Sequence, residues 1–79
     1  MNKINENRYK QIGLKIAYYR KLNGLTQEEL AEKIDRSTGF IGQVEAPNIV
    51  APVSLETLFS IADVFNLMPY KLLEFDDVP

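Results

Sequence analysis

The chain has 79 residues, of which 46% are apolar and 25% charged, with a net charge of −2. These values indicate one globular domain and exclude a disordered chain. Cysteine and histidine are both absent. This excludes disulfide bonds and makes a metal site, a cofactor or enzyme activity unexpected. We find no membrane-spanning apolar run, signal peptide or ligand-sensing domain, so we expect a cytoplasmic protein without a small-molecule ligand.

The first predicted helix carries apolar residues at helical spacing. Its stripe is formed by Tyr9, Ile12, Ile16 and Tyr19. The pair Asn23-Gly24 is typical of a helix C-terminus, so we expect the helix to stop there.

The second predicted helix begins at Thr26. Glu29 follows three residues later, which is the spacing of a capping box. Asp35 stands where a glycine is usual, and Asp tolerates a left-handed backbone. The apolar face between these ends consists of Leu30, Ala31 and Ile34.

The third predicted helix begins after Ser37, a favoured N-cap residue. It ends at Ala46, because Pro47 disfavours helical geometry in the residue before it. Two glycines in its interior each cost roughly 1 kcal/mol relative to alanine, so this helix depends on packing. The inward residues are Ile41 and Val44, and the glycines are Gly39 and Gly42.

The last two predicted helices follow an apolar loop over residues 46–53 that contains two prolines. Ser54 is the N-cap of the fourth helix, and Pro69 begins a short fifth helix. The stripe of the fourth helix is Leu55, Leu58, Ala62 and Phe65, flanked by Phe59 and Ile61. The fifth helix presents Leu72 and Leu73.

Two short helices joined by a turn, as the second and third are here, form a helix-turn-helix. The charge is unevenly distributed. Residues 1–36 carry eight basic and five acidic residues (+3), whereas residues 37–79 carry one basic and six acidic residues (−5). The basic half is suited to phosphate, although an ordinary solvated surface explains the same distribution and DNA-binding domains tend to be basic overall.

The chain resembles the XRE family of helix-turn-helix proteins, which includes the Cro and cI phage repressors. The similarity rests on Ile12-Gly13, Ile16, Arg20, the block at 24–31, Ser37, Ile41, Val44-Glu45, Pro52, the block at 54–58, and Ile61-Ala62. It implies an all-α, compact five-helix, lambda-repressor-like DNA-binding domain. We expect a single domain over residues 1–79 with a core at about 8–75, a flexible N-terminal arm over 1–7 and a flexible tail over 76–79.

The resemblance also implies which residues meet DNA. Gln43 is the best candidate for specificity, since a glutamine amide can bond adenine N6 and N7 together. Thr38 has a hydroxyl and a methyl group suited to several bases. A solvated surface glutamine and a plain capping-turn residue are the alternatives at these two positions. The base-reading set is Ser37, Thr38, Gly39, Gly42 and Gln43, and the phosphate-contacting set is Thr26, Gln27, Lys33, Arg36, Arg20 and Asn48.

A pair of charges has a structural role in this family. By resemblance, Arg20 and Glu45 form a partly buried ion pair that ties the first helix to the third. The charge of Glu45 would repel phosphate, which favours this role. Arg20 has enough donors to serve a phosphate as well.

The chain departs from the family pattern where it would read DNA. The third helix carries no Lys or Arg, and the loop at 46–53 offers only Asn48 as a polar side chain. We expect a sequence-specific DNA-binding transcription regulator, a homodimer on a two-fold operator with the third helix in the major groove. The alternative is a protein-interaction module on the same scaffold, such as an antitoxin or adaptor. Its partner would bind through loop 46–53 or the fourth and fifth helices.

Overall fold

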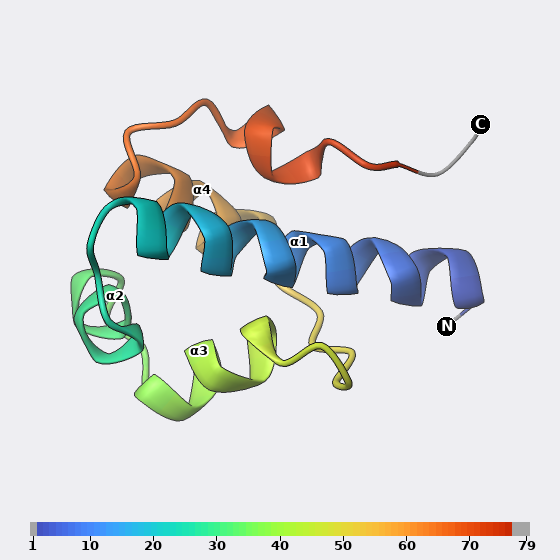
Figure 1. The fold of residues 1–79 in the computed structure, drawn as a ribbon, viewed down its shortest axis with the longest axis horizontal. Helices are drawn as coiled ribbons and strands as arrows, with labels where there is room; N and C mark the ends of the chain where they lie inside the picture. The colour runs from blue at the N-terminus through green and yellow to red at the C-terminus, as the bar shows by residue number, and fades with distance from the viewer. Residues whose placement is uncertain (1, 77–79) are drawn as a thin grey trace.

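The structure, a computed structural model, describes residues 2–76, and this range holds helices and no strand. Four α-helices, α1 (Lys3–Leu22), α2 (Gln27–Lys33), α3 (Thr38–Glu45) and α4 (Leu55–Val64), precede a 3-10 helix, η1 (Pro69–Leu73). The long α1 runs through the middle of the molecule, with α3 on one side and the η1 segment on the other (Figure 1). This arrangement leaves α2 and α3 together at one end, with α3 along the edge of the fold.

Each α-helix begins at a side chain that accepts a backbone hydrogen bond. Thr26, Ser37 and Ser54 accept from the third residue after them, as predicted. Asn2 does the same for α1, accepting from the N–H of Asn5 at 2.8 Å. Residues 3–7, which we expected to form an N-terminal arm, are therefore the start of α1, because Asn2 caps them and no glycine or proline interrupts them. Residue 1 of the expected arm and residues 77–79 of the expected tail lie outside the described range.

Three of the α-helices end with a residue in the left-handed region. Gly24 (φ 70°) ends α1, Asp35 (φ 57°) ends α2 and Asn66 (φ 55°) ends α4. In each case the next residue donates a backbone hydrogen bond five residues back, the bond of a Schellman motif. The stop at Gly24 and the left-handed Asp35 were predicted, whereas Asn66 was not.

One apolar core joins all five elements. Each helix contributes one large side chain with no exposed surface: Ile16, Leu30, Ile41, Ile61 and Leu72. Gly13 lets α1 approach α3 closely, because a Cβ atom at this position would overlap the backbone carbonyl of Val44. The position of α3 is therefore set by backbone contact as well as by side chains.

Two predictions about the C-terminal half were wrong. A five-helix domain was expected, but only four of the described helices are α-helices. The short fifth helix begins at Pro69 as expected and has 3-10 geometry, because five residues are too few to offset the cost of nucleating an α-helix. Leu55 was expected on the inward stripe of α4, but it is 64% exposed. Leu58, Ile61 and Ala62 form the buried face instead, because Leu55 lies at the first turn, beyond the edge of the core.

Candidate nucleic-acid interface

The outer face of α3 is exposed, neutral and polar. Ile41 and Val44 turn inward to the core, and this fixes which residues of α3 face solvent. Gly42 is half-buried on the same helix. The remaining members of the predicted base-reading set are all exposed: Ser37, Thr38, Gly39 and Gln43.

These residues differ in how many polar groups they have available. The hydroxyl of Ser37 accepts the N–H of Phe40 at 3.1 Å, so its lone pair serves the helix cap. Within residues 2–76, the side chains of Thr38 and Gln43 make no hydrogen bond. Thr38 and Gln43 therefore hold the uncommitted donors and acceptors on this face.

The two glycines of α3 are not required by packing. A Cβ atom at Gly39 would have its nearest neighbour, the Ser37 hydroxyl, at 3.9 Å, and at Gly42 the nearest atom would be Gln27 Oε1 at 3.7 Å. Both distances are ordinary van der Waals contacts, and neither residue needs positive φ. The glycines weaken the helix without a structural need, and they leave the surface of α3 free of side chains beside Gln43.

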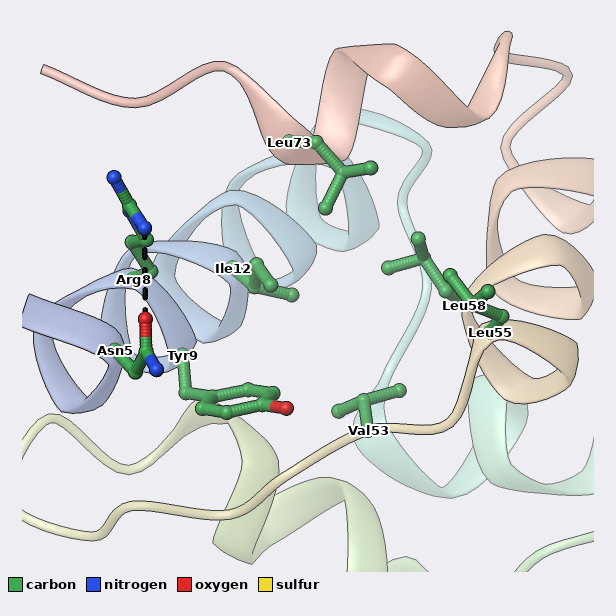
Figure 2. A pocket seen from close by; sticks show the side chains of 8 residues that line it. All are labelled: Asn5, Arg8, Tyr9, Ile12, Val53, Leu55, Leu58 and Leu73. Carbon is green, nitrogen blue, oxygen red and sulfur yellow. Dashed lines mark hydrogen bonds between the residues drawn. The ribbon is translucent and has the colours of Figure 1, made fainter. Parts of the chain in front are cut away.

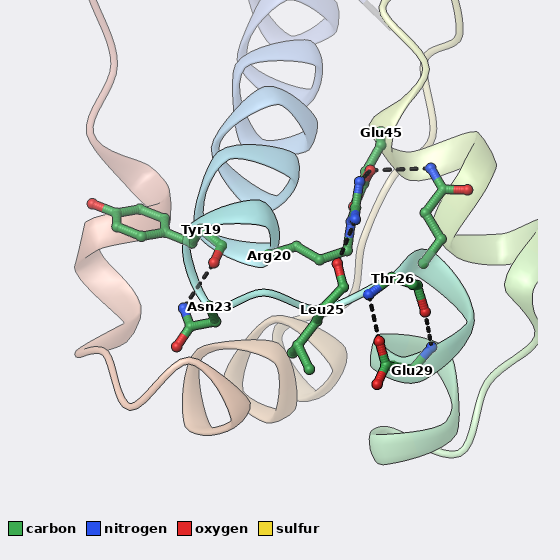
Figure 3. A network of polar contacts seen from close by, with 8 residues as sticks. Tyr19, Arg20, Asn23, Leu25, Thr26, Glu29 and Glu45 are labelled. Carbon is green, nitrogen blue, oxygen red and sulfur yellow. Dashed lines mark hydrogen bonds and ion pairs between the residues drawn. The ribbon is translucent and has the colours of Figure 1, made fainter.

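Arg20 and Glu45 form the ion pair that the resemblance implied. Arg20 Nε donates to Glu45 Oε2 at 2.7 Å and Arg20 Nη2 donates to Glu45 Oε1 at 2.9 Å (Figure 3). A third donor, Nη1, bonds the carbonyl of Leu25 at 2.7 Å. The hydrogen bond to Glu45 outweighs the effect of burial and raises the pKa of Arg20. Arg20 and Glu45 are only 7% and 8% exposed, so the guanidinium of Arg20 is shielded from a phosphate and serves the fold.

Gln27 joins this pair from the first turn of α2. Its Nε2 donates to Glu45 Oε1 at 3.1 Å, so the carboxylate connects α1, α2 and α3. Sequence reasoning placed Gln27 only at a phosphate and missed this bond. The sequence contains little indication of this bond, since 18 residues separate Gln27 from Glu45.

The other predicted phosphate contacts are spread over the surface. Lys33 and Asn48 are exposed, and Asn48 lies in a turn closed by the bond from Ile49 N–H to the carbonyl of Ala46. Thr26 is occupied by its capping box with Glu29.

Arg36 is partly committed to the fold. Its guanidinium carbon lies 3.7 Å from the centre of the Phe40 ring, and its Nη1 donates to Thr57 at 3.2 Å. Sequence reasoning missed both partners, because Arg36 precedes the N-cap Ser37 and helical spacing does not apply to it. Arg36 therefore points toward α4 and retains only part of its donor capacity.

An apolar groove of about 400 Å³ lies elsewhere on the molecule. Tyr9 and Ile12 of α1, Leu58 of α4 and Leu73 of η1 turn toward one another around it (Figure 2). The exposed Leu55 also lines it. The groove contains none of the predicted DNA contacts.

This geometry defines a helix-turn-helix domain with α3 on its surface. The sequence profile of the HTH_3 family, described as helix-turn-helix, matches residues 16–72. The chain belongs to this family of XRE-type helix-turn-helix proteins, whose domains bind DNA. No curated protein and no solved structure matches the chain significantly. Among the residues described, no helix is both long and apolar enough to traverse a membrane.

Proposed function

We propose that the protein is a sequence-specific DNA-binding transcription regulator that inserts α3 into the major groove. The observation that carries the proposal is the exposed face of α3 within a helix-turn-helix, with the amide of Gln43 and the hydroxyl of Thr38 uncommitted. A glutamine amide offers one donor and one acceptor side by side, which matches the edge of adenine in the major groove. The neighbouring glycines allow bases to come close to the helix backbone.

The phosphate contacts in this proposal are few. α3 carries no cation, Arg20 is buried, and Arg36 is shared with Phe40 and Thr57. Lys33, Asn48 and the remaining donors of Gln27 and Arg36 are the proposed contacts. We expect weak binding by one domain and propose that a homodimer binds a two-fold operator. In a dimer, recognition helices about 34–36 Å apart would reach successive major grooves.

The experiment is a selection of duplexes from a randomised library at low salt, followed by sequencing of the bound fraction. The proposal predicts an enriched sequence with two-fold symmetry. Sedimentation equilibrium of the protein with that duplex should give two chains per duplex. Recovery of the library without enrichment would overturn the proposal.

The second candidate function is a protein-interaction module on the same scaffold. The apolar groove with the exposed Leu55 favours it, because an exposed apolar surface often marks a partner site. A stoichiometric complex with a purified partner, lost in Leu55→Asp, would support it if the wild-type protein enriches no duplex. Tight, salt-sensitive duplex binding by a protein that forms no such complex would rule it out.

A further inference from the structure

The hydrogen bond between Gln27 and Glu45 fixes which way the glutamine amide faces. A carboxylate only accepts hydrogen bonds, so the atom of Gln27 that lies 3.1 Å from Glu45 Oε1 is the amide nitrogen. Both carboxylate oxygens of Glu45 also accept from Arg20, at 2.7 and 2.9 Å. The buried ion pair therefore holds the carboxylate still, and the carboxylate orients the amide.

As a consequence, the carbonyl oxygen of Gln27 is directed away from Glu45. It lies beside Gly42, and a Cβ atom added to Gly42 would be 3.7 Å from this oxygen. Within residues 2–76, no donor bonds this oxygen, and Gln27 is partly exposed. The structure thus holds an oriented, unpaired acceptor next to the bare surface of α3.

We infer that Gln27 is a second base-reading residue, whose Oε1 accepts a hydrogen bond from an exocyclic amino group in the major groove. Adenine N6 and cytosine N4 are the amino groups presented there. This inference rests on the proposed function. It differs from a phosphate contact, because phosphate oxygens and this carbonyl are both acceptors and cannot bond each other.

Gly42 has a defined role in this arrangement. With no side chain, it leaves the oxygen of Gln27 open on the side of α3. An added methyl group fits without a clash but lies against that oxygen and restricts the approach of a base. Gly42→Ala therefore tests the inference in a protein whose fold is preserved.

The experiment compares Gln27→Met, Gly42→Ala and the double variant with the wild-type protein. Gln27→Met keeps the length of the side chain and removes its polar atoms. Base preferences are measured by selection from randomised duplexes, and folding is checked by thermal unfolding. Gly42→Ala should unfold at the same or a higher temperature, because alanine is the better helix former.

We expect both single variants to lose roughly tenfold in preference for adenine or cytosine at the same base pair, a pair other than the one affected by Gln43→Ala. The double variant should lose no more than either single variant, because both changes disable one acceptor.

The inference is overturned if Gln27→Met weakens all sequences by one factor and leaves every preference unchanged. It is also overturned if the effects of the two variants add, since Gly42→Ala would then act by its own contact with DNA. The wild-type protein is the control that separates this inference from the proposed function. If the wild-type protein enriches no sequence, the proposed function is wrong; if it enriches a sequence and the variants keep every preference, only the role of Gln27 is wrong.

Discussion

Arg20 of α1 and Glu45, the last residue of α3, bind each other through two parallel hydrogen bonds of 2.7 and 2.9 Å in a nearly solvent-free position. The same end of α3 touches α1 at Gly13, where the two backbones meet. The carboxylate of Glu45 also receives the amide of Gln27 from α2. The orientation of α3, and hence the direction of its exposed face, depends on this carboxylate together with the backbone contact at Gly13.

Removing one member of the ion pair should destabilise the domain strongly. Arg20→Met leaves the carboxylate of Glu45 buried without its main partner, and we expect the free energy of unfolding to fall by about 3–5 kcal/mol. Denaturant titration followed by circular dichroism measures this loss.

The double variant Arg20→Met, Glu45→Met is the matched control. It removes both charges and should recover most of the lost stability, because an apolar pair of similar volume avoids the cost of burying charge. A single-variant loss below about 1 kcal/mol would mean that the pair behaves as an exposed one and would contradict its structural role.

Replacing a glycine of α1 and a glycine of α3 by alanine should change the stability of the protein in opposite directions. Gly13→Ala forces the added methyl group onto the carbonyl of Val44, so α1 and α3 have to move apart, and we expect a loss of about 1–3 kcal/mol. Gly39→Ala is the control, since its nearest neighbour lies at 3.9 Å, and it should stabilise the protein by up to about 1 kcal/mol. Thermal unfolding of both variants measures the contrast. Equal changes in the two variants would show that helix propensity alone governs them.

The local signals in the sequence predicted much of this fold. Caps at Thr26, Ser37 and Ser54 and the left-handed Asp35 follow from short-range hydrogen bonding, which depends on residues within a few positions of each other. The exposure of Leu55 was missed, because helical spacing shows which side of a helix is apolar and not where the core ends.

Contacts between residues far apart in the sequence were harder to predict. The family resemblance implied the ion pair between Arg20 and Glu45, but the bond from Gln27 to Glu45 needs the relative position of α2 and α3. The stacking of Arg36 on Phe40 is local, yet its bond to Thr57 joins residues 21 positions apart. The exposure of Gln43 and Thr38 followed from the inward periodicity of Ile41 and Val44. Their contact with DNA remains a prediction.

The capping box makes part of the stability depend on pH. The hydrogen bond from the backbone N–H of Thr26, with a further contribution from its side chain, lowers the pKa of Glu29. Because the pKa is lower in the folded state, the contribution of the ionised Glu29 is fully present above the unfolded value of about 4.3 and is lost as pH falls through the folded value. Glu29→Gln keeps a capping side chain that does not titrate.

Denaturant titrations between pH 3 and 7 should therefore show the wild-type advantage over Glu29→Gln shrinking at the acidic end. Two parallel stability curves over this range would contradict the link between the cap and the pKa.

Salt dependence should reveal how few phosphates the domain neutralises. Lys33 and Arg36 are the cations nearest to α3 in the sequence, so we expect about two phosphate contacts per half-site. For the dimer on the enriched duplex this predicts a slope of log K against log salt of about −3.6. Fluorescence anisotropy with the enriched duplex at several salt concentrations measures this slope. Lys33→Gln removes one contact from each half-site, so the slope should become less steep by about 1.8 while base preference is unchanged. A slope several times steeper would show that further cations reach the backbone.

The most direct test of base reading by α3 is the affinity of the wild-type protein and Gln43→Ala for the enriched duplex and its single-base variants. We predict that the wild-type protein discriminates against the three substitutions at one base pair by about 1–3 kcal/mol, and that Gln43→Ala loses this discrimination while retaining the wild-type unfolding temperature. Equal discrimination by both proteins at every position would contradict the proposal that Gln43 reads a base from the exposed face of α3.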